Sequence, residues 1–120
     1  MKSLLAVLVF LAAAPSFAGN KYECVGTEPY WKAKVQDDLI LADDANDGPQ
    51  ILSVSNRIYP LGTADSFGEV VKAQGAKYDA VLTIRADAKC NDGQSDDAYS
   101  HEVWFLKGNK LVVGCCNIAK

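Results

Sequence analysis

The chain lacks runs of basic residues and is mildly acidic overall. Its 120 residues include 12 Lys or Arg and 15 Asp or Glu, which gives a formal net charge of −3. Binding to nucleic acid or to an anionic membrane depends on clustered positive charge. The composition therefore argues against both of these partners and allows a basic protein as partner.

The sequence also has few of the residues that build metal, nucleotide or catalytic centres. No C-x-x-C spacing occurs and His101 is the only histidine, so a zinc site is not expected. The acidic stretch 43–49 departs from the EF-hand calcium pattern and lacks its closing Glu. Since no phosphate-binding loop or activated nucleophile is recognisable either, we expect no cofactor, no metal and no enzymatic activity.

The one long apolar run is at the N-terminus and is too short to span a bilayer. Lys2 precedes it, and Ser16-Phe17-Ala18 has small residues at the positions that signal peptidase inspects. Residues 1–18 are therefore predicted to be a secretory signal and 19–120 one small mature domain with a net charge of −4. Gly19 follows the cut in place of a lipid-carrying cysteine, so we expect a periplasmic or secreted protein without a membrane anchor.

The chain has only four cysteines, and all of them lie in the mature part. They are Cys24, Cys90, Cys115 and Cys116. An even number in an exported chain predicts two disulfides. Spacing alone leaves all three pairings open. Because Cys24 lies near the mature start and the Cys115/Cys116 pair near the end, one bridge is expected to tie the two ends together.

Helical periodicity is scarce, and alternation of apolar and polar residues dominates. It predicts short strands at 21–25, 30–35, 38–42, 50–55 and 77–85. The stretch 63–75 is ambiguous: Ser66 and Glu69 could form a capping box that opens a short helix. The β-branched pair Val70-Val71 favours instead a strand at 69–73, which we prefer.

The last two apolar runs flank Gly108-Asn109, a strong signal for a hairpin because both residues tolerate positive φ. The predicted register places Trp104 opposite Val113 and Lys107 opposite Lys110. Both faces are apolar, so the hairpin is either central in a sandwich or uses one face for contact. Seven to eight short strands predict an all-β, disulfide-stabilised antiparallel barrel or sandwich with a filled interior.

Several motifs resemble an uncharacterised family of bacterial envelope proteins. Gly-Thr-Glu-Pro-Tyr-Trp at 26–31 is similar to its G-T-E-P-F-W stretch, and 90–96 is similar to its C-x-D-G-M-S-D stretch. Gly114-Cys115 resembles the closing G-C. Tyr30 and Gln94 depart from the family pattern. The resemblance implies an envelope β-domain without an established activity. Many relatives are lipoproteins, but the missing lipid cysteine means that anchoring does not carry over.

This resemblance also implies a disulfide pairing. It puts Cys90 and Cys115 together, which leaves Cys116 for Cys24. Neighbouring residues on a strand point to opposite faces, so Cys115 and Cys116 can reach different partners. A bridge between Cys115 and Cys116 is the alternative. A looser similarity, Tyr-x-Cys near the mature start of a small disulfide-bonded barrel, links Tyr22 and Cys24 to bacterial inhibitors of c-type lysozyme.

Three groups of residues could carry chemistry or binding. Ser100-His101-Glu102 contains catalytic residue types, but His101 should point away from its two neighbours and be a partly exposed strand residue. Carboxylates at Asp92, Asp96 and Asp97 could form an acid–base pair, although turn formation explains them better. The third group, Glu28, Tyr30 and Trp31, is either a contact patch or a loop capped by a core Trp.

We therefore predict that the protein presents a surface and does not turn over a substrate. The candidate surface joins Glu28, Tyr30 and Trp31 with the acidic residues Asp92, Asp96 and Asp97. Carboxylates would steer a basic partner, and aromatic side chains would supply contact area. The expected function is that of a non-enzymatic envelope protein that binds another protein; the alternative is an inhibitor of a basic c-type lysozyme.

Overall fold

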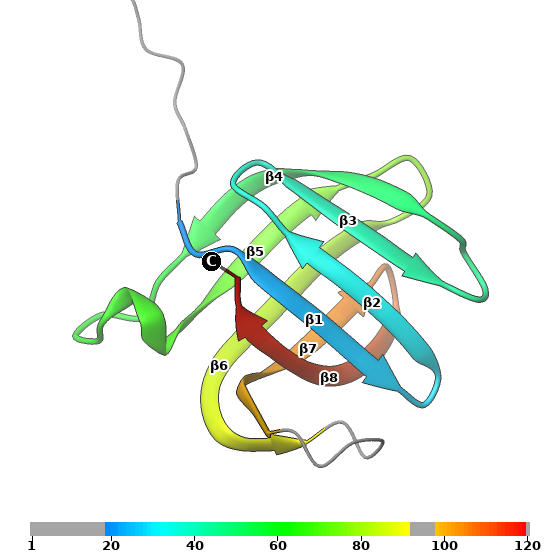
Figure 1. Cartoon of the computed structure of the whole chain (residues 1–120). Helices are drawn as coiled ribbons and strands as arrows, with labels where there is room; N and C mark the ends of the chain where they lie inside the picture. Colours follow the sequence, from blue (N-terminus) through cyan, green and yellow to red (C-terminus); the bar gives the residue numbers. More distant parts are fainter. Residues whose placement is uncertain (1–18, 92–97, 120) are drawn as a thin grey trace, which may run out of the picture.

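The computed structural model describes residues 19–91 and 98–119, which form eight strands and one short 3-10 turn (Figure 1). The strands are β1 (Tyr22–Thr27), β2 (Tyr30–Val35), β3 (Leu39–Asp44), β4 (Gln50–Ile58), β5 (Gly68–Gln74), β6 (Asp79–Asn91), β7 (Ala98–Lys107) and β8 (Lys110–Ile118). The all-β prediction is confirmed.

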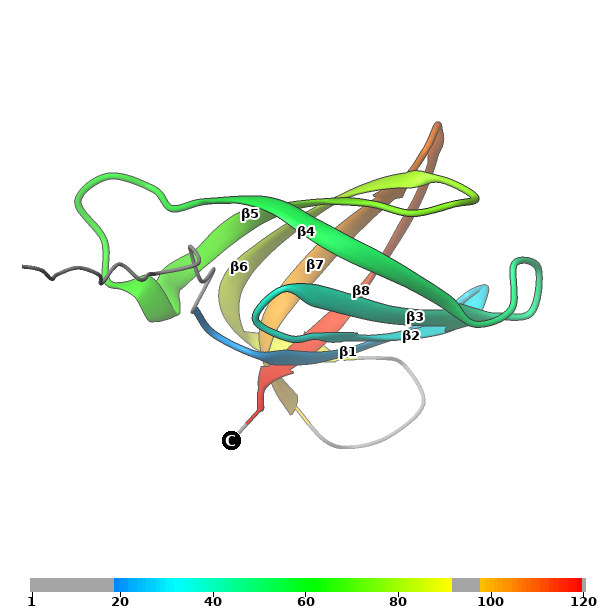
Figure 2. The same cartoon turned by 90° about the horizontal axis from the view of Figure 1, so that it is seen from above.

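Each strand pairs antiparallel with the next one along the chain, and β8 returns to pair with β1. The result is a closed up-and-down barrel (Figure 2). Closure gives every described strand two hydrogen-bonded neighbours, which is one way in which proteins remove exposed sheet edges. Of the two architectures predicted from the sequence, the protein adopts the barrel.

Alternation along each strand sends one set of side chains into the barrel and the other to the outside. In β2, Trp31, Ala33 and Val35 are buried, whereas Lys32 and Lys34 between them are exposed. The buried side chains of all eight strands form one hydrophobic cluster in the interior. As expected for a barrel of this size, side chains fill its centre.

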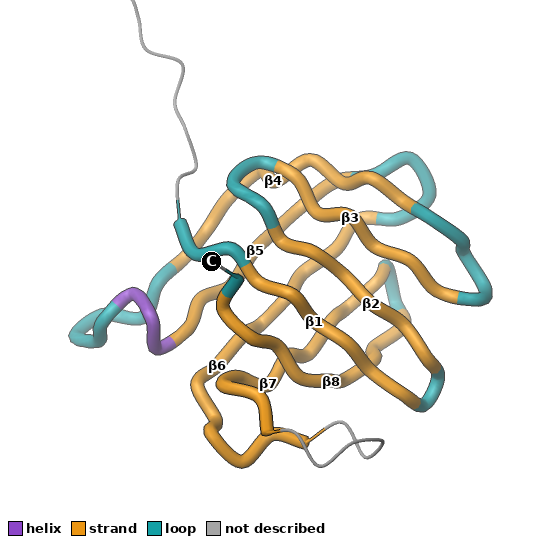
Figure 3. Tube along the Cα trace, in the orientation of Figure 1, coloured by secondary structure: helices purple, strands orange, loops and turns teal. Residues whose placement is uncertain are grey.

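The ambiguous stretch is a strand preceded by a single helical turn. The 3-10 turn η1 covers Asp65–Phe67, and β5 begins immediately after it (Figure 3). Gly68 has φ 155°, a conformation that favours glycine, and Val71 is fully buried on the inner face. The preferred strand prediction is confirmed, and β5 is one residue longer at each end.

The final hairpin has the predicted register: Trp104 faces Val113 and Lys107 faces Lys110. Phe105 points into the barrel with 1% exposure, whereas Trp104 points outward with 55% exposure. A hairpin in a barrel wall has one inner and one outer face. The outer face of this hairpin is therefore apolar and open to solvent.

Both predicted disulfides are confirmed. Cys24–Cys116 joins directly opposite residues of β1 and β8, the two strands that close the barrel. Cys90–Cys115 ties the far end of β6 to β8. Two disulfides within one chain are typical of proteins that fold in an oxidising environment.

Candidate binding surface

The turn between β1 and β2 is a rigid tip with exposed side chains. Glu28 and Pro29, joined by a cis peptide bond, form the turn and are exposed. Tyr30, the first residue of β2, has 57% of its surface exposed. Thus the structure places Glu28 and Tyr30 of the predicted surface side by side at one end of the barrel.

Trp31 does not belong to the exposed surface, because only 1% of it is accessible. Its indole N–H donates a hydrogen bond of 3.3 Å to the Val113 carbonyl, and its ring meets Phe105 edge-on. A Cβ added at Gly26 would lie 2.0 Å from the indole nitrogen, so the glycine leaves room for the ring. Trp31 therefore acts as the core residue that anchors the tip.

A groove of about 860 Å³ runs across the outer face of β1 to β4 and begins at this tip. Its apolar lining includes Tyr30, Leu41 and Ile51 from three successive strands. Leu41 and Ile51 face each other across β3 and β4, and they are 42% and 67% exposed. Tyr99, at the start of β7, lines the groove as well.

Charges of both signs alternate along the groove. Lys34 is paired in register with Glu23, and Lys32 with Asp43; all four side chains line the groove. Their formal charges cancel. A partner for this groove needs apolar groups with polar groups of both signs between them, which is typical of a protein surface.

The acidic residues Asp92, Asp96 and Asp97 lie outside the described residues. The segments on either side of them are described. Cys90 is fixed to β8 by its disulfide, and Tyr99 pairs with Cys90 across β6 and β7. Because Tyr99 and Tyr30 line the same groove, it connects the tip with the base of the acidic segment.

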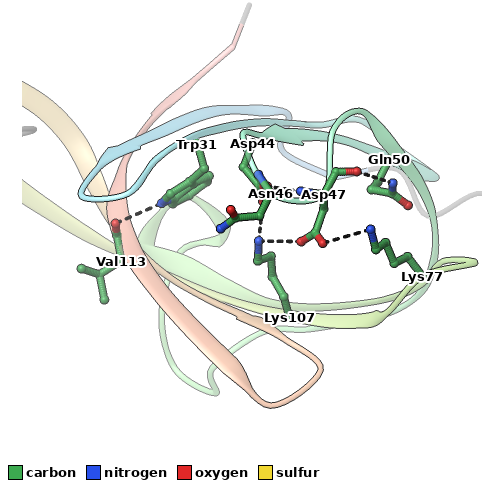
Figure 4. A network of polar contacts seen from close by, with 8 residues as sticks. All are labelled: Trp31, Asp44, Asn46, Asp47, Gln50, Lys77, Lys107 and Val113. Carbon is green, nitrogen blue, oxygen red and sulfur yellow. Dashed lines mark hydrogen bonds and ion pairs between the residues drawn. The ribbon is translucent and has the colours of Figure 1, made fainter.

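The acidic stretch that starts at the end of β3 binds a lysine of β7. Lys107 Nζ donates hydrogen bonds to Asp44 and, at 3.0 Å, to Asp47 (Figure 4). Hydrogen bonds and charge from Lys107 hold the pKa of Asp47 below its usual value. Burial alone would raise the pKa of Asp44, but Lys107 together with the backbone N–H groups of Asn46 and Asp47 outweighs it and lowers that pKa. Two carboxylates of the acidic stretch 43–49 thus bind an ammonium group of the protein itself.

A second polar cluster occupies the opposite end of the barrel. Arg57 donates to Glu69 at 2.8 Å, and Tyr22 donates to the other oxygen of the same carboxylate at 3.0 Å. Arg57 and Glu69 have side-chain exposures of 3% and 0%. Burial, with a contribution from the charge of Glu69, raises the pKa of Tyr22 far above its ordinary value. The cluster is inaccessible and structural.

The prediction that His101 is a partly exposed residue is wrong, since it is 3% exposed. It shares the inner face of β7 with Val103 and Phe105. Its Nε2–H donates to the Ser66 carbonyl at 2.7 Å, and Nδ1 lies 2.7 Å from Ser100 Oγ. Glu102 points outward and binds Arg85. The three adjacent residues therefore do not form a triad.

Sequence reasoning missed most of the groove. Alternation in the predicted strand 30–35 is consistent with Lys32 and Lys34 sharing one face, but it does not connect them with Leu41 or Ile51. The available signal was that Leu41 and Ile51 are apolar although each alternates with a core residue, Ile40 or Leu52. Which outer residues become neighbours depends on the strand order, which alternation does not encode.

Comparison of the chain with protein-family models, curated proteins and solved structures finds no match. Within the described ranges, no group of three or more His, Cys, Asp or Glu side chains is placed to hold a metal ion. The same part of the chain contains no helix long and apolar enough to cross a membrane. The function must therefore be inferred from the surface itself.

Proposed function

We propose that this chain is an exported, non-enzymatic protein of the cell envelope that binds another protein. The binding surface consists of the tip, with Glu28 and Tyr30, and the adjoining groove with Leu41 and Ile51. The observation that carries the proposal is the exposed Tyr30 beside apolar groove residues on a tip anchored by buried Trp31.

Rigidity supports binding by this surface. The groove residues project from hydrogen-bonded strands, and the tip is held by the packing of Trp31 against Phe105. Preformed surfaces lose less conformational entropy on association, and aromatic residues often dominate the binding energy. A net charge of −4 after signal removal would speed the approach of a basic partner.

The pairing of the buried ionisable side chains supports a role without catalysis. The buried Lys107 and Arg57 are each paired with carboxylates, and His101 is hydrogen-bonded through both ring nitrogens. These contacts pair the buried charges at the barrel ends and stabilise its structure, although Arg57 Nε has no hydrogen-bond partner among the described residues. The accessible groups of the groove instead alternate in charge and suit recognition.

The proposal is tested by capture from an envelope extract on the immobilised mature chain. We expect a partner to be retained by the wild type and lost with Tyr30→Ala, with an affinity decrease of about tenfold or more. Leu61→Ala, which removes a 98% exposed apolar residue from a loop outside the groove, is the matched control and should retain it. Equal capture by Tyr30→Ala, or no capture at low salt, would refute the proposal.

The second candidate function is inhibition of a basic c-type lysozyme. The observation that favours it is the exposed carboxylate of Glu28 at the end of a hairpin. Such a carboxylate can approach the positive surface of a basic enzyme. We expect the wild type in molar excess to slow cell-wall lysis by the lysozyme and Glu28→Gln to do so less. Unchanged lysis with the wild type would exclude this function.

A further inference from the structure

The outer face of β7 and β8 is an apolar surface that the proposed function does not use. Trp104 and Val113 are paired across the two strands, as are Leu106 and Leu111. These four side chains are between 37% and 56% exposed. We call them the hairpin face. In the ring of eight strands, β7 and β8 stand opposite β3 and β4, which carry Leu41 and Ile51 of the groove.

The hairpin face is held rigidly from behind. Val103 and Phe105 alternate with Trp104 and Leu106 on β7 and are fully buried in the core. β7 is hydrogen-bonded to β6 along most of its length. β8 pairs with β1 only from Cys115 to Ile118, and nearer the hairpin turn the Val113 carbonyl accepts a hydrogen bond from the Trp31 indole. The four outer side chains therefore keep their positions, so a partner can bind them with little loss of backbone entropy.

The register of the hairpin lets the face meet a second copy of itself in a regular way. Consider a two-fold axis that lies between β7 and β8 and parallel to them. It places Trp104 of one copy over Val113 of the other, and Leu106 over Leu111. A large side chain thus meets a small one, and two equal ones meet each other. This is the arrangement required of an isologous dimer interface.

The charges around the face also suit a second copy. The ion pair between Arg85 and Glu102 lies beside Trp104 and is neutral overall. Lys72 lies further out in the same sheet, on β5. The mature chain is acidic, so two copies repel each other over most of their surfaces. This face has no excess of negative charge, and its charged groups stand at the rim, as in ordinary protein interfaces.

We propose that the hairpin face is a self-association surface, on which a second copy of this chain docks around a two-fold axis. The apolar centre consists of Trp104, Leu106, Leu111 and Val113 of both copies, and the Arg85–Glu102 pairs lie at its rim. Leu41 and Ile51 of each copy's groove lie on β3 and β4, on the far side of the barrel from the hairpin face.

Sedimentation equilibrium of the mature chain over a range of concentrations tests this inference. We expect a monomer–dimer equilibrium for the wild type and a monomer for Trp104→Lys. Tyr30→Lys places the same charge at a similarly exposed aromatic residue in the groove and should dimerise like the wild type. Thermal unfolding of each variant checks that it is folded.

Tryptophan fluorescence provides a second readout on the unmodified chain. Trp104 is exposed and Trp31 is buried, so dimerisation should shift the emission of Trp104 to shorter wavelength as the concentration rises. Trp104→Phe should abolish the shift. A wild type that stays monomeric at every concentration overturns the inference, even if Trp104→Lys proves to lose binding of a different protein. Dimerisation of folded Trp104→Lys with wild-type affinity overturns it as well.

Discussion

At the scale of single residues, the tip depends on Gly26, because any larger side chain there would collide with Trp31. Gly26 leaves the space in which the indole of Trp31 lies, and Gly114 allows a close approach of the Val25 carbonyl. These glycines belong to two of the three motifs on which the resemblance to an envelope family is based. Their role in this chain is steric: they let a large buried ring lock the β1–β2 turn, which then exposes Tyr30.

We predict that Gly26→Ala destabilises the fold by about 1–3 kcal/mol, because the new methyl group would overlap the buried ring of Trp31. Urea denaturation measures the change. In a double-mutant cycle, Gly26→Ala combined with Trp31→Phe should cost less than the sum of the single variants, since the smaller ring relieves the overlap. Additive costs would contradict the steric explanation.

Lys107 is the residue that binds the acidic stretch to the barrel. We predict that Lys107→Met lowers the free energy of unfolding at neutral pH by about 3–5 kcal/mol, because Asp44 and Asp47 lose their buried counter-charge. Lys110→Met, which removes the exposed lysine opposite it, should cost far less. Urea denaturation of both variants provides the comparison.

The same contact makes a pH-dependent contribution with a definite sign. The pKa values of Asp44 and Asp47 are lowered in the folded state, so their stabilisation is present above the ordinary value of 3.8 and is lost as the pH falls through the folded-state values. The stability difference between wild type and Lys107→Met should therefore shrink in strong acid. A constant difference would contradict this role for Lys107.

At the scale of elements, local patterns determined the strands well but not all their surroundings. Alternation predicted the strand at 30–35, in which Trp31, Ala33 and Val35 share the buried face, and Gly108-Asn109 predicted the last hairpin with its register. The burial of His101 could have been predicted, because His101 alternates in step with the apolar residues Val103 and Phe105 on the same strand. The binding of Lys107 by Asp44 and Asp47 could not, because it joins residues about sixty positions apart.

The disulfides should stabilise two different parts of the barrel. Cys24–Cys116 spans 92 residues and crosses the seam between β1 and β8, whereas Cys90–Cys115 spans 25. In the chain-entropy model, the losses on replacement by paired serines are about 4.6 and 3.5 kcal/mol. Chemical denaturation compares the two variants. A larger loss from removing Cys90–Cys115 would contradict the predicted order.

At the scale of the whole molecule, the sequence predicted the strands but not the closure of the barrel. Counting strands gave a barrel or a sandwich, and only the long-range pairing of β8 with β1 decides between them. Closure also fixes which outer residues become neighbours, and so creates the groove with Tyr30, Leu41 and Ile51. Of that surface, the sequence alone indicated Glu28 and Tyr30.

Export is a further property of the whole chain. We predict that the mature protein begins at Gly19, because the apolar run and Ser16-Phe17-Ala18 are typical of a cleaved secretory signal. Mass spectrometry of the protein recovered from the envelope fraction gives the N-terminus directly. An envelope protein that still begins at Met1 would be incompatible with this prediction.

The most direct test of the proposed binding function is photo-crosslinking in the producing cell. A photoreactive phenylalanine is introduced at position 30 in the groove or, as control, at the exposed position 61 outside it. Irradiation should yield a discrete adduct with a second protein from position 30 and none from position 61. Absence of an adduct at position 30, or the same adduct from both positions, would contradict binding of a partner protein through the tip and groove.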